Sequence, residues 1–129
     1  MKVEWLDRTA LELPFLTLCL SEQQYLSAVK HLKVANPSPW LSDKHAACVH
    51  TFDNKEGGVA CVVCLAVVPD ASPINVAASL AHEAVHVWQV CRKDMGEQNA
   101  GDEIEAYAIQ NIVAMLFKSY VKQTQEATK

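Results

Sequence analysis

The stretch PINVAASLAHEAVHVWQVC, residues 73–91, decides how the rest of the chain is arranged, because it is long, apolar and free of helix breakers after its first residue. Pro73 suits the first turn of a helix, where its missing N–H would have no intrahelical partner. We therefore expect a helix from Pro73 to Cys91 or slightly beyond. Between Ile74 and Cys91 the single charged residue is Glu83, so this helix is expected to be buried. Its apolar side is expected to consist of Ile74, Ala77, Ala78, Ala81, Val85 and Trp88.

Upstream of this helix, the sequence predicts one strand and one short helix. Residues 13–20, LPFLTLCL, are apolar and few, which favours a buried strand. Ser21 and Gln24 form a capping-box pattern, so we expect a helix over residues 22–33. Residues 36–40, NPSPW, contain two prolines and are expected to form a loop.

The remaining segments complete the predicted fold. Two apolar runs, residues 46–52 and 58–68, are separated by a polar segment and predict a β-hairpin. Asp102 follows a glycine and begins a last helix, and the polar residues from Gln123 onward are expected to fray. This order predicts an α+β fold, in which a small antiparallel or mixed sheet packs on the helix of residues 73–91 and on a long C-terminal helix.

Length and composition are those of one ordinary globular domain. With 129 residues, of which 50% are hydrophobic and 20% charged, we expect a single domain over residues 1–129. The net charge is -4 and the Lys and Arg residues are scattered, so no nucleic-acid partner is expected. No apolar run is long enough to span a bilayer, and charged residues interrupt the region where a signal peptide would be apolar. The expected location is the cytoplasm, with no membrane partner.

The five cysteines lie within apolar segments and are expected to be reduced. Cys61 and Cys64 form one CxxC, but they lie in a strand-like run, where alternation would point their side chains to opposite faces. We therefore interpret them as small buried hydrophobic residues in preference to a metal-binding or redox pair.

The chemistry of the chain is expected to centre on HEAVH, residues 82–86. Residues four apart lie on one face of a helix, so His82 and His86 can reach the same zinc ion. Glu83 lies one step round the helix, where it could take a proton from a water activated by the metal. The competing interpretation is a pair of core histidines hydrogen-bonded to Glu83 or to the backbone.

A catalytic zinc ion needs a third protein ligand, and the last predicted helix offers acidic candidates in its first turn. We favour Glu105, because it shares a face with Ala108, Ile112 and Leu116 and because the small side chain of Ala108 would let the two helices approach closely. Glu103 is the rival, since it begins the same Glu-x-x-Ala pattern but points to another side of the helix.

HEAVH followed by Glu105-x-x-Ala108 resembles the gluzincins, the zinc metallopeptidases with HExxH on one helix and a glutamate on the next. Eighteen residues separate His86 from Glu105, which is similar to the aminopeptidase branch. The resemblance implies a minimal zincin-like fold, His82, His86 and Glu105 as zinc ligands, and Glu83 as the general base. The exopeptidase motif Gly-x-Met-x-Asn is absent from the sequence, so N-terminal trimming is not implied, and no oxyanion-stabilising residue is fixed among Tyr107, Tyr120, His45 and His50.

The stretches HEAVHVWQ and EAYAIQ also resemble parts of short proteins carried by bacteriophages and prophages. The preferred hypothesis is a zinc-dependent peptidase or amidase with a peptide or protein substrate. The second is a non-catalytic, zinc-binding zincin-like module that binds a partner protein, and an open coordination position would separate the two. The third is a metal-free helical interaction protein.

Overall fold

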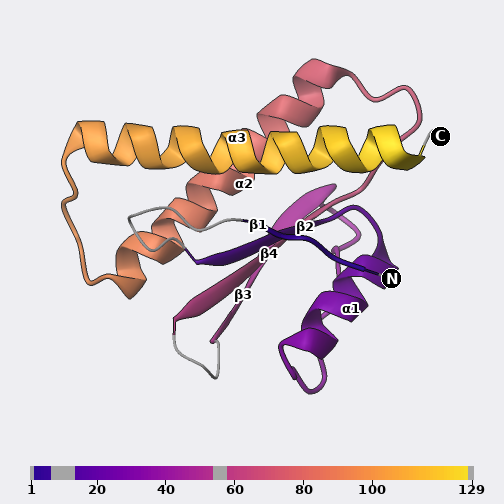
Figure 1. Cartoon of the computed structure of the whole chain (residues 1–129), viewed down its shortest axis with the longest axis horizontal. Helices are drawn as coiled ribbons and strands as arrows, with labels where there is room; N and C mark the ends of the chain where they lie inside the picture. Colours follow the sequence, from indigo (N-terminus) through magenta and orange to yellow (C-terminus); the bar gives the residue numbers. More distant parts are fainter. Residues whose placement is uncertain (1, 7–13, 54–57, 128–129) are drawn as a thin grey trace. The chain divides into compact units, whose positions relative to one another are not determined.

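The computed structural model describes residues 2–6, 14–53 and 58–127, and its architecture is α+β (Figure 1). Three helices and a four-stranded mixed sheet form two compact units. Met1–Asp70 contains the sheet and the first helix, and Ala71–Lys129 contains the other two helices. The α+β prediction and the long C-terminal helix are confirmed, while the single domain over residues 1–129 stays a prediction.

The sheet of the first unit has the strand order β1-β2-β4-β3. β1 and β2 are antiparallel, β2 and β4 are parallel, and β4 and β3 form the predicted antiparallel hairpin. The hairpin turn at residues 54–57 and the predicted start of β2 at Leu13 lie outside the described residues. The strands are β1 Trp5–Leu6, β2 Phe15–Cys19, β3 Ala47–Asp53 and β4 Val59–Leu65.

β4 occupies an interior position because both of its edges are hydrogen-bonded to other strands. Its sequence VACVVCL is rich in β-branched residues, and the side chains from Ala60 to Leu65 are all buried. Such an uninterrupted apolar run is typical of a strand in the interior of a sheet, with hydrogen-bonded neighbours on both sides.

Helix α1, Glu22–His31, begins as the capping box predicts. The Ser21 side chain accepts a hydrogen bond from the Gln24 backbone N–H at 3.2 Å, and the Gln24 Oε1 accepts one from the Leu20 N–H at 2.7 Å. The buried side of α1, comprising Tyr25, Ala28 and Val29, packs against the face of the sheet that carries Cys19, Val62 and Cys64.

In α1, the C-terminal turn ends on a residue in the left-handed region. Lys33 has φ 59°, its N–H donates to Lys30 O at 3.0 Å, and the Val34 N–H donates to Val29 O at 3.0 Å. These two bonds form a Schellman motif, in which glycine is the preferred residue at the left-handed position. Lysine at this position carries a conformational penalty that glycine would not.

The second unit consists of two long helices, α2 Pro73–Asp94 and α3 Asp102–Ala127, which pack on each other (Figure 1). α2 begins with Pro73 in its first turn, as predicted. It ends in a second Schellman motif, where Gly96 has φ 76°, its N–H donates to Lys93 O at 3.1 Å and the Glu97 N–H donates to Arg92 O at 2.9 Å. None of the helices within the described ranges combines the length and hydropathy needed to cross a lipid bilayer.

Two expectations for these helices were wrong. α3 continues through Gln123 to Ala127 without fraying, and polar side chains near its end bond back along the helix, such as the Thr124 hydroxyl to Tyr120 O at 2.8 Å. In α2, Trp88 is buried as expected, but Ile74 is 79% exposed and Val85 is 37% exposed, so most of the buried side differs from the one expected. The buried side consists of Val76, Leu80, Glu83, Ala84, Val87, Trp88 and Cys91.

Candidate metal centre

His82 and His86 lie one helical turn apart on an exposed side of α2, and their rings converge. The two Nε2 atoms are 3.2 Å apart, and the ring centroids are 4.9 Å apart at an interplanar angle of 76°. The Nδ1 of His86 lies 2.9 Å from Oε1 of Gln89. Gln89 can therefore orient the His86 ring so that Nε2 faces its neighbour.

This geometry is close to what a shared zinc ion requires. With Zn–N bonds of 2.0–2.1 Å and tetrahedral angles, two coordinating nitrogens would lie about 3.4 Å apart. The donor set of the pair therefore fits zinc. Without a metal, the same distance corresponds to a hydrogen bond in which one neutral ring donates to the other.

Glu83, the predicted general base, differs from its two histidine neighbours in burial. Its side chain is 5% exposed, although both histidines are exposed. A carboxylate at this depth has lost most of its contact with bulk water, so it depends on neighbouring polar groups for its hydrogen bonds. The burial of Glu83 agrees with the expectation of a buried helix, whereas the exposure of His82 and His86 argues against the competing interpretation of core histidines.

Glu105, the predicted third ligand, faces α2 from the first turn of α3. Its Oε2 accepts a hydrogen bond from the indole Nε1–H of Trp88 at 3.0 Å. The ligand atoms of His82, His86 and Glu105 do not all come within 4.8 Å of one another in the structure. The two imidazoles are thus brought together, whereas the role of Glu105 as a ligand stays a prediction that requires its carboxylate to move.

The preference for Glu105 over Glu103 as the third ligand is consistent with the Trp88–Glu105 contact. Ala108, one turn after Glu105, is 1% exposed, so this face of α3 is the buried one near its start. Glu103 is exposed in the first turn of α3, where an acidic residue complements the positive end of the helix. The Glu105 carboxylate contacts α2 through the Trp88 indole.

A pocket of about 390 Å³ lies beside Glu105, between the C-terminal half of α2 and the start of α3. Trp88 and Glu105 are among its lining residues, as is Gln89, which contacts His86. The volume is within the usual range for small-ligand sites. His82 and His86 do not line this pocket, so the imidazole pair and the pocket are neighbours connected through Gln89.

The four residues considered for an oxyanion-stabilising role come from both compact units of the chain. Tyr107 is 58% exposed on α3, and Tyr120 lies several turns further along that helix. His45 is exposed, and its Nδ1 lies 2.7 Å from the Ser42 hydroxyl. His50 lies on β3.

A different cluster of potential metal ligands was missed by the sequence analysis. Cys48, His50 and Cys64 have ligand atoms that all lie within 4.8 Å of one another. The prediction that Cys61 and Cys64 would be buried is confirmed, with both at 0% exposure, but Cys64 also belongs to this polar cluster. The signal that could have found it is the spacing Cys48-x-His50 on one strand of a hairpin whose other strand carries Cys64.

Ionisation of the Cys64 thiol in this cluster is suppressed. The hydrogen bond between the Cys64 and Cys19 thiols, together with burial, raises the pKa of Cys64 far above its usual range. Burial likewise raises the pKa of Tyr25, with the neighbouring cysteines adding to the shift. The Cys64 thiol therefore stays protonated more readily than a free thiol when no metal is bound.

Comparisons of the chain with protein-family models, with curated proteins and with solved structures give no match.

Proposed function

We propose that this chain is a zinc-dependent hydrolase that cleaves peptide or amide bonds, with His82 and His86 as metal ligands and Glu83 as general base. The observation that carries the proposal is the 3.2 Å separation of the two Nε2 atoms, one turn apart on α2. Glu105 is the third ligand in this proposal.

Zinc in such a site would supply Lewis-acid chemistry, polarising a substrate carbonyl and making water acidic enough to react near neutral pH. Glu83 would accept the proton of the attacking water and deliver it to the leaving amine. Its burial would hold the carboxylate in a fixed orientation, and Gln89 would hold His86. The neighbouring pocket, lined by Trp88 and Gln89, would receive one side of the substrate.

The proposal requires one rearrangement. Because the Glu105 carboxylate accepts the hydrogen bond of Trp88, the oxygen that binds the metal must leave the indole or the second oxygen must turn toward the histidines. Glu105 is exposed, so its side chain can change rotamer without moving either helix.

The Trp88–Glu105 hydrogen bond also favours a second candidate, a non-catalytic zinc-binding module that binds a partner protein. In that case Glu105 joins α2 and α3 through its hydrogen bond to Trp88, and His82 and His86 bind zinc together with ligands other than Glu105. The two candidates differ in whether hydrolysis depends on Glu83.

The test is elemental analysis and peptidase assay of the reduced full chain beside single variants. We expect His86→Ala and Glu105→Ala each to retain about one zinc ion fewer per chain than the unmodified protein, because each removes a predicted ligand. Glu83→Gln should retain the metal and lose hydrolysis of a casein or mixed-peptide substrate. Glu103→Ala, which removes a neighbouring exposed carboxylate, is the matched control for Glu105→Ala and should behave as the unmodified protein.

Unchanged zinc content in His86→Ala would refute the metal site. Zinc loss in His86→Ala with no Glu83-dependent hydrolysis would favour the non-catalytic module. Retention of zinc by Glu105→Ala together with its loss in Glu103→Ala would transfer the role of third ligand to Glu103.

A further inference from the structure

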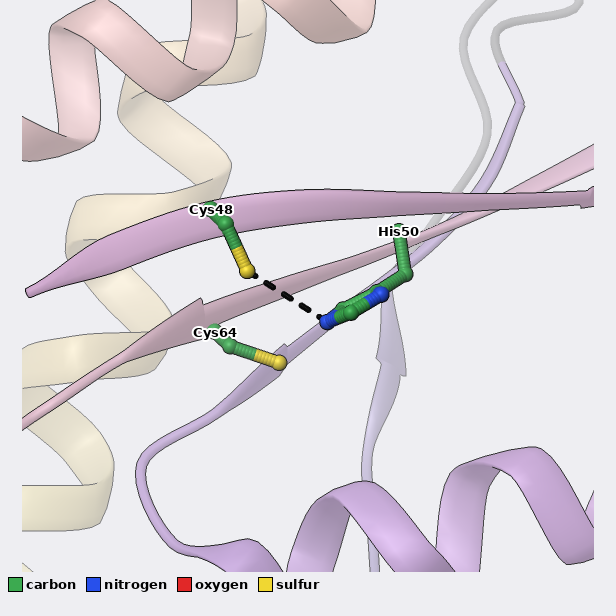
Figure 2. A group of neighbouring side chains, drawn as sticks. All are labelled: Cys48, His50 and Cys64. Atoms are coloured by element: carbon green, nitrogen blue, oxygen red, sulfur yellow. Dashed lines mark hydrogen bonds between the residues drawn. The ribbon is translucent and has the colours of Figure 1, made fainter. Parts of the chain in front are cut away.

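Three cysteines lie in a row across three adjacent strands of the sheet. Cys64 on β4 is the register partner of Cys19 on β2 and of Cys48 on β3. His50 lies two residues beyond Cys48 on β3, and alternation along a strand places both side chains on the same face. Figure 2 shows Cys48, His50 and Cys64 directed toward one another over this face.

The side chains of this group are in close contact. Sγ of Cys48 lies 3.3 Å from Nε2 of His50, and Sγ of Cys64 completes a group whose members are all within 4.8 Å of one another (Figure 2). The carbonyl oxygen of Trp40 also points to the group, 2.9 Å from His50 Nε2 and 3.2 Å from Cys48 Sγ. Two sulfur atoms, one imidazole nitrogen and one oxygen therefore converge.

These separations are near those around a tetrahedral zinc ion. Zn–S bonds of about 2.3 Å and Zn–N bonds of about 2.0–2.1 Å would separate a sulfur from a nitrogen ligand by about 3.6 Å and two sulfurs by about 3.8 Å. The Cys48–His50 contact would have to open by a few tenths of an ångström, which side-chain rotation on a sheet face can supply.

We propose that Cys48, His50 and Cys64 bind one thiophilic cation, zinc in the first instance, at a site separate from the histidine pair of α2. The ligand types are those of structural zinc sites, and the Trp40 carbonyl oxygen faces the fourth position. On binding, the two thiols lose their protons to solvent, and the two thiolates balance the charge of the divalent ion. His50 stays neutral, and its single proton moves from Nε2 to Nδ1, leaving Nε2 free to coordinate.

The surroundings of the cluster are compatible with a bound ion. Cys64 is fully buried, while Cys48 and His50 are half-buried and open a route for the ion from solvent. The Tyr25 ring lies 4.7 Å from the His50 ring and limits its rotation. The Cys19 thiol is hydrogen-bonded to Cys64 and can orient the Cys64 sulfur toward a bound ion.

The test uses cobalt(II) as a spectroscopic probe on the reduced full chain. Thiolate ligands give cobalt(II) an intense near-ultraviolet charge-transfer absorption, which sites made only of histidine and carboxylate lack. We expect this absorption to saturate at one equivalent of cobalt(II) and to be abolished by zinc. His50→Ala and Cys48→Ala, which change half-buried residues, should each weaken binding at least tenfold.

The matched pair Cys64→Ala and Cys61→Ala separates coordination from packing. Both cysteines are fully buried on β4, but Cys61 is absent from the cluster. Cys64→Ala should remove the absorption and Cys61→Ala should retain it. His82→Ala should also retain it, which keeps this site distinguishable from the proposed hydrolytic one.

The absence of thiolate absorption in the reduced, unmodified protein would overturn the proposal, and this measurement does not depend on the folding of any variant. Equal loss in Cys61→Ala and Cys64→Ala would overturn it too. Protection of Cys48 from alkylation by stoichiometric zinc would support it, whereas an unchanged alkylation rate would count against it.

Discussion

If His82 and His86 bind zinc as proposed, replacing Trp88 with phenylalanine is expected to tighten that binding. In the structure the Trp88 indole N–H holds the Glu105 carboxylate at 3.0 Å, away from the two imidazoles. A hydrogen bond to a charged group contributes about 1.5–3 kcal/mol, and the exposure of Glu105 places it at the low end of that range. Phenylalanine removes the donor and keeps much of the ring, so Glu105 becomes available as a ligand.

The expected effect is an approximately tenfold lower dissociation constant, since about 1.4 kcal/mol corresponds to a factor of ten. It is measured by competition with a chromophoric zinc chelator, in a His50→Ala background that removes the proposed thiolate site. Val87→Ala, a neighbouring buried substitution that leaves the Trp88–Glu105 contact in place, is the control for loosened packing and should leave affinity unchanged. An affinity in Trp88→Phe within threefold of the parent would refute the view that the indole and the metal compete for Glu105.

Three further predictions concern the fold. Gly96→Ala should lower the free energy of unfolding by about 1 kcal/mol, because φ is 76° at this position, whereas Lys33→Gly, at φ 59°, should raise it by a similar amount. Urea unfolding monitored by circular dichroism measures both changes, and a shift of both variants in the same direction would contradict the Schellman motifs assigned to the two helix ends. Ser21→Ala should lower the free energy of unfolding by about 1 kcal/mol, because it removes the N-cap of α1. Ser21→Asp, which keeps a capping oxygen, is the control in the same assay and should leave the free energy of unfolding nearly unchanged. Because folding raises the pKa of Cys64, the stabilising contribution of its thiol is fully present below about pH 8.5 and is lost as the pH rises above that value. The reduced protein should therefore lose stability at high pH, and Cys64→Ala should lose less over the same pH range.

Most elements could be predicted because their signals are local. Pro73 marks the first turn of α2, Ser21 and Gln24 cap α1, and the two apolar runs around residues 53–58 form a hairpin. β1 was missed because its two residues are too few to show any periodicity.

The side of α2 that is buried could not be predicted from composition. This helix is apolar on nearly every side, so its sequence has no strong contrast from which to choose a buried face. Ile74 and Val85 are exposed, and the polar Glu83 is buried in their place. The pairing of Glu105 with Trp88 depends on how α2 and α3 pack, which spacing along either helix does not determine.

The cysteine–histidine cluster was missed for a related reason. Alternation correctly separates Cys61 from Cys64, but it does not say which residue of another strand lies opposite each of them. Only the register that pairs Cys48 with Cys64 brings His50 beside both sulfurs. One residue of slippage in the hairpin would place Cys48 and His50 on the opposite face.

The interior place of β4 has a consequence for the growing polypeptide. β4 is the last strand to leave the ribosome, yet it pairs with β2, where Phe15 lies opposite Ala60. Until Leu65 has been synthesised, one apolar edge of β2 has no partner within the sheet, and such edges recruit strands from other chains. Nascent chains stalled before β4 should therefore be the most aggregation-prone and the most dependent on chaperones.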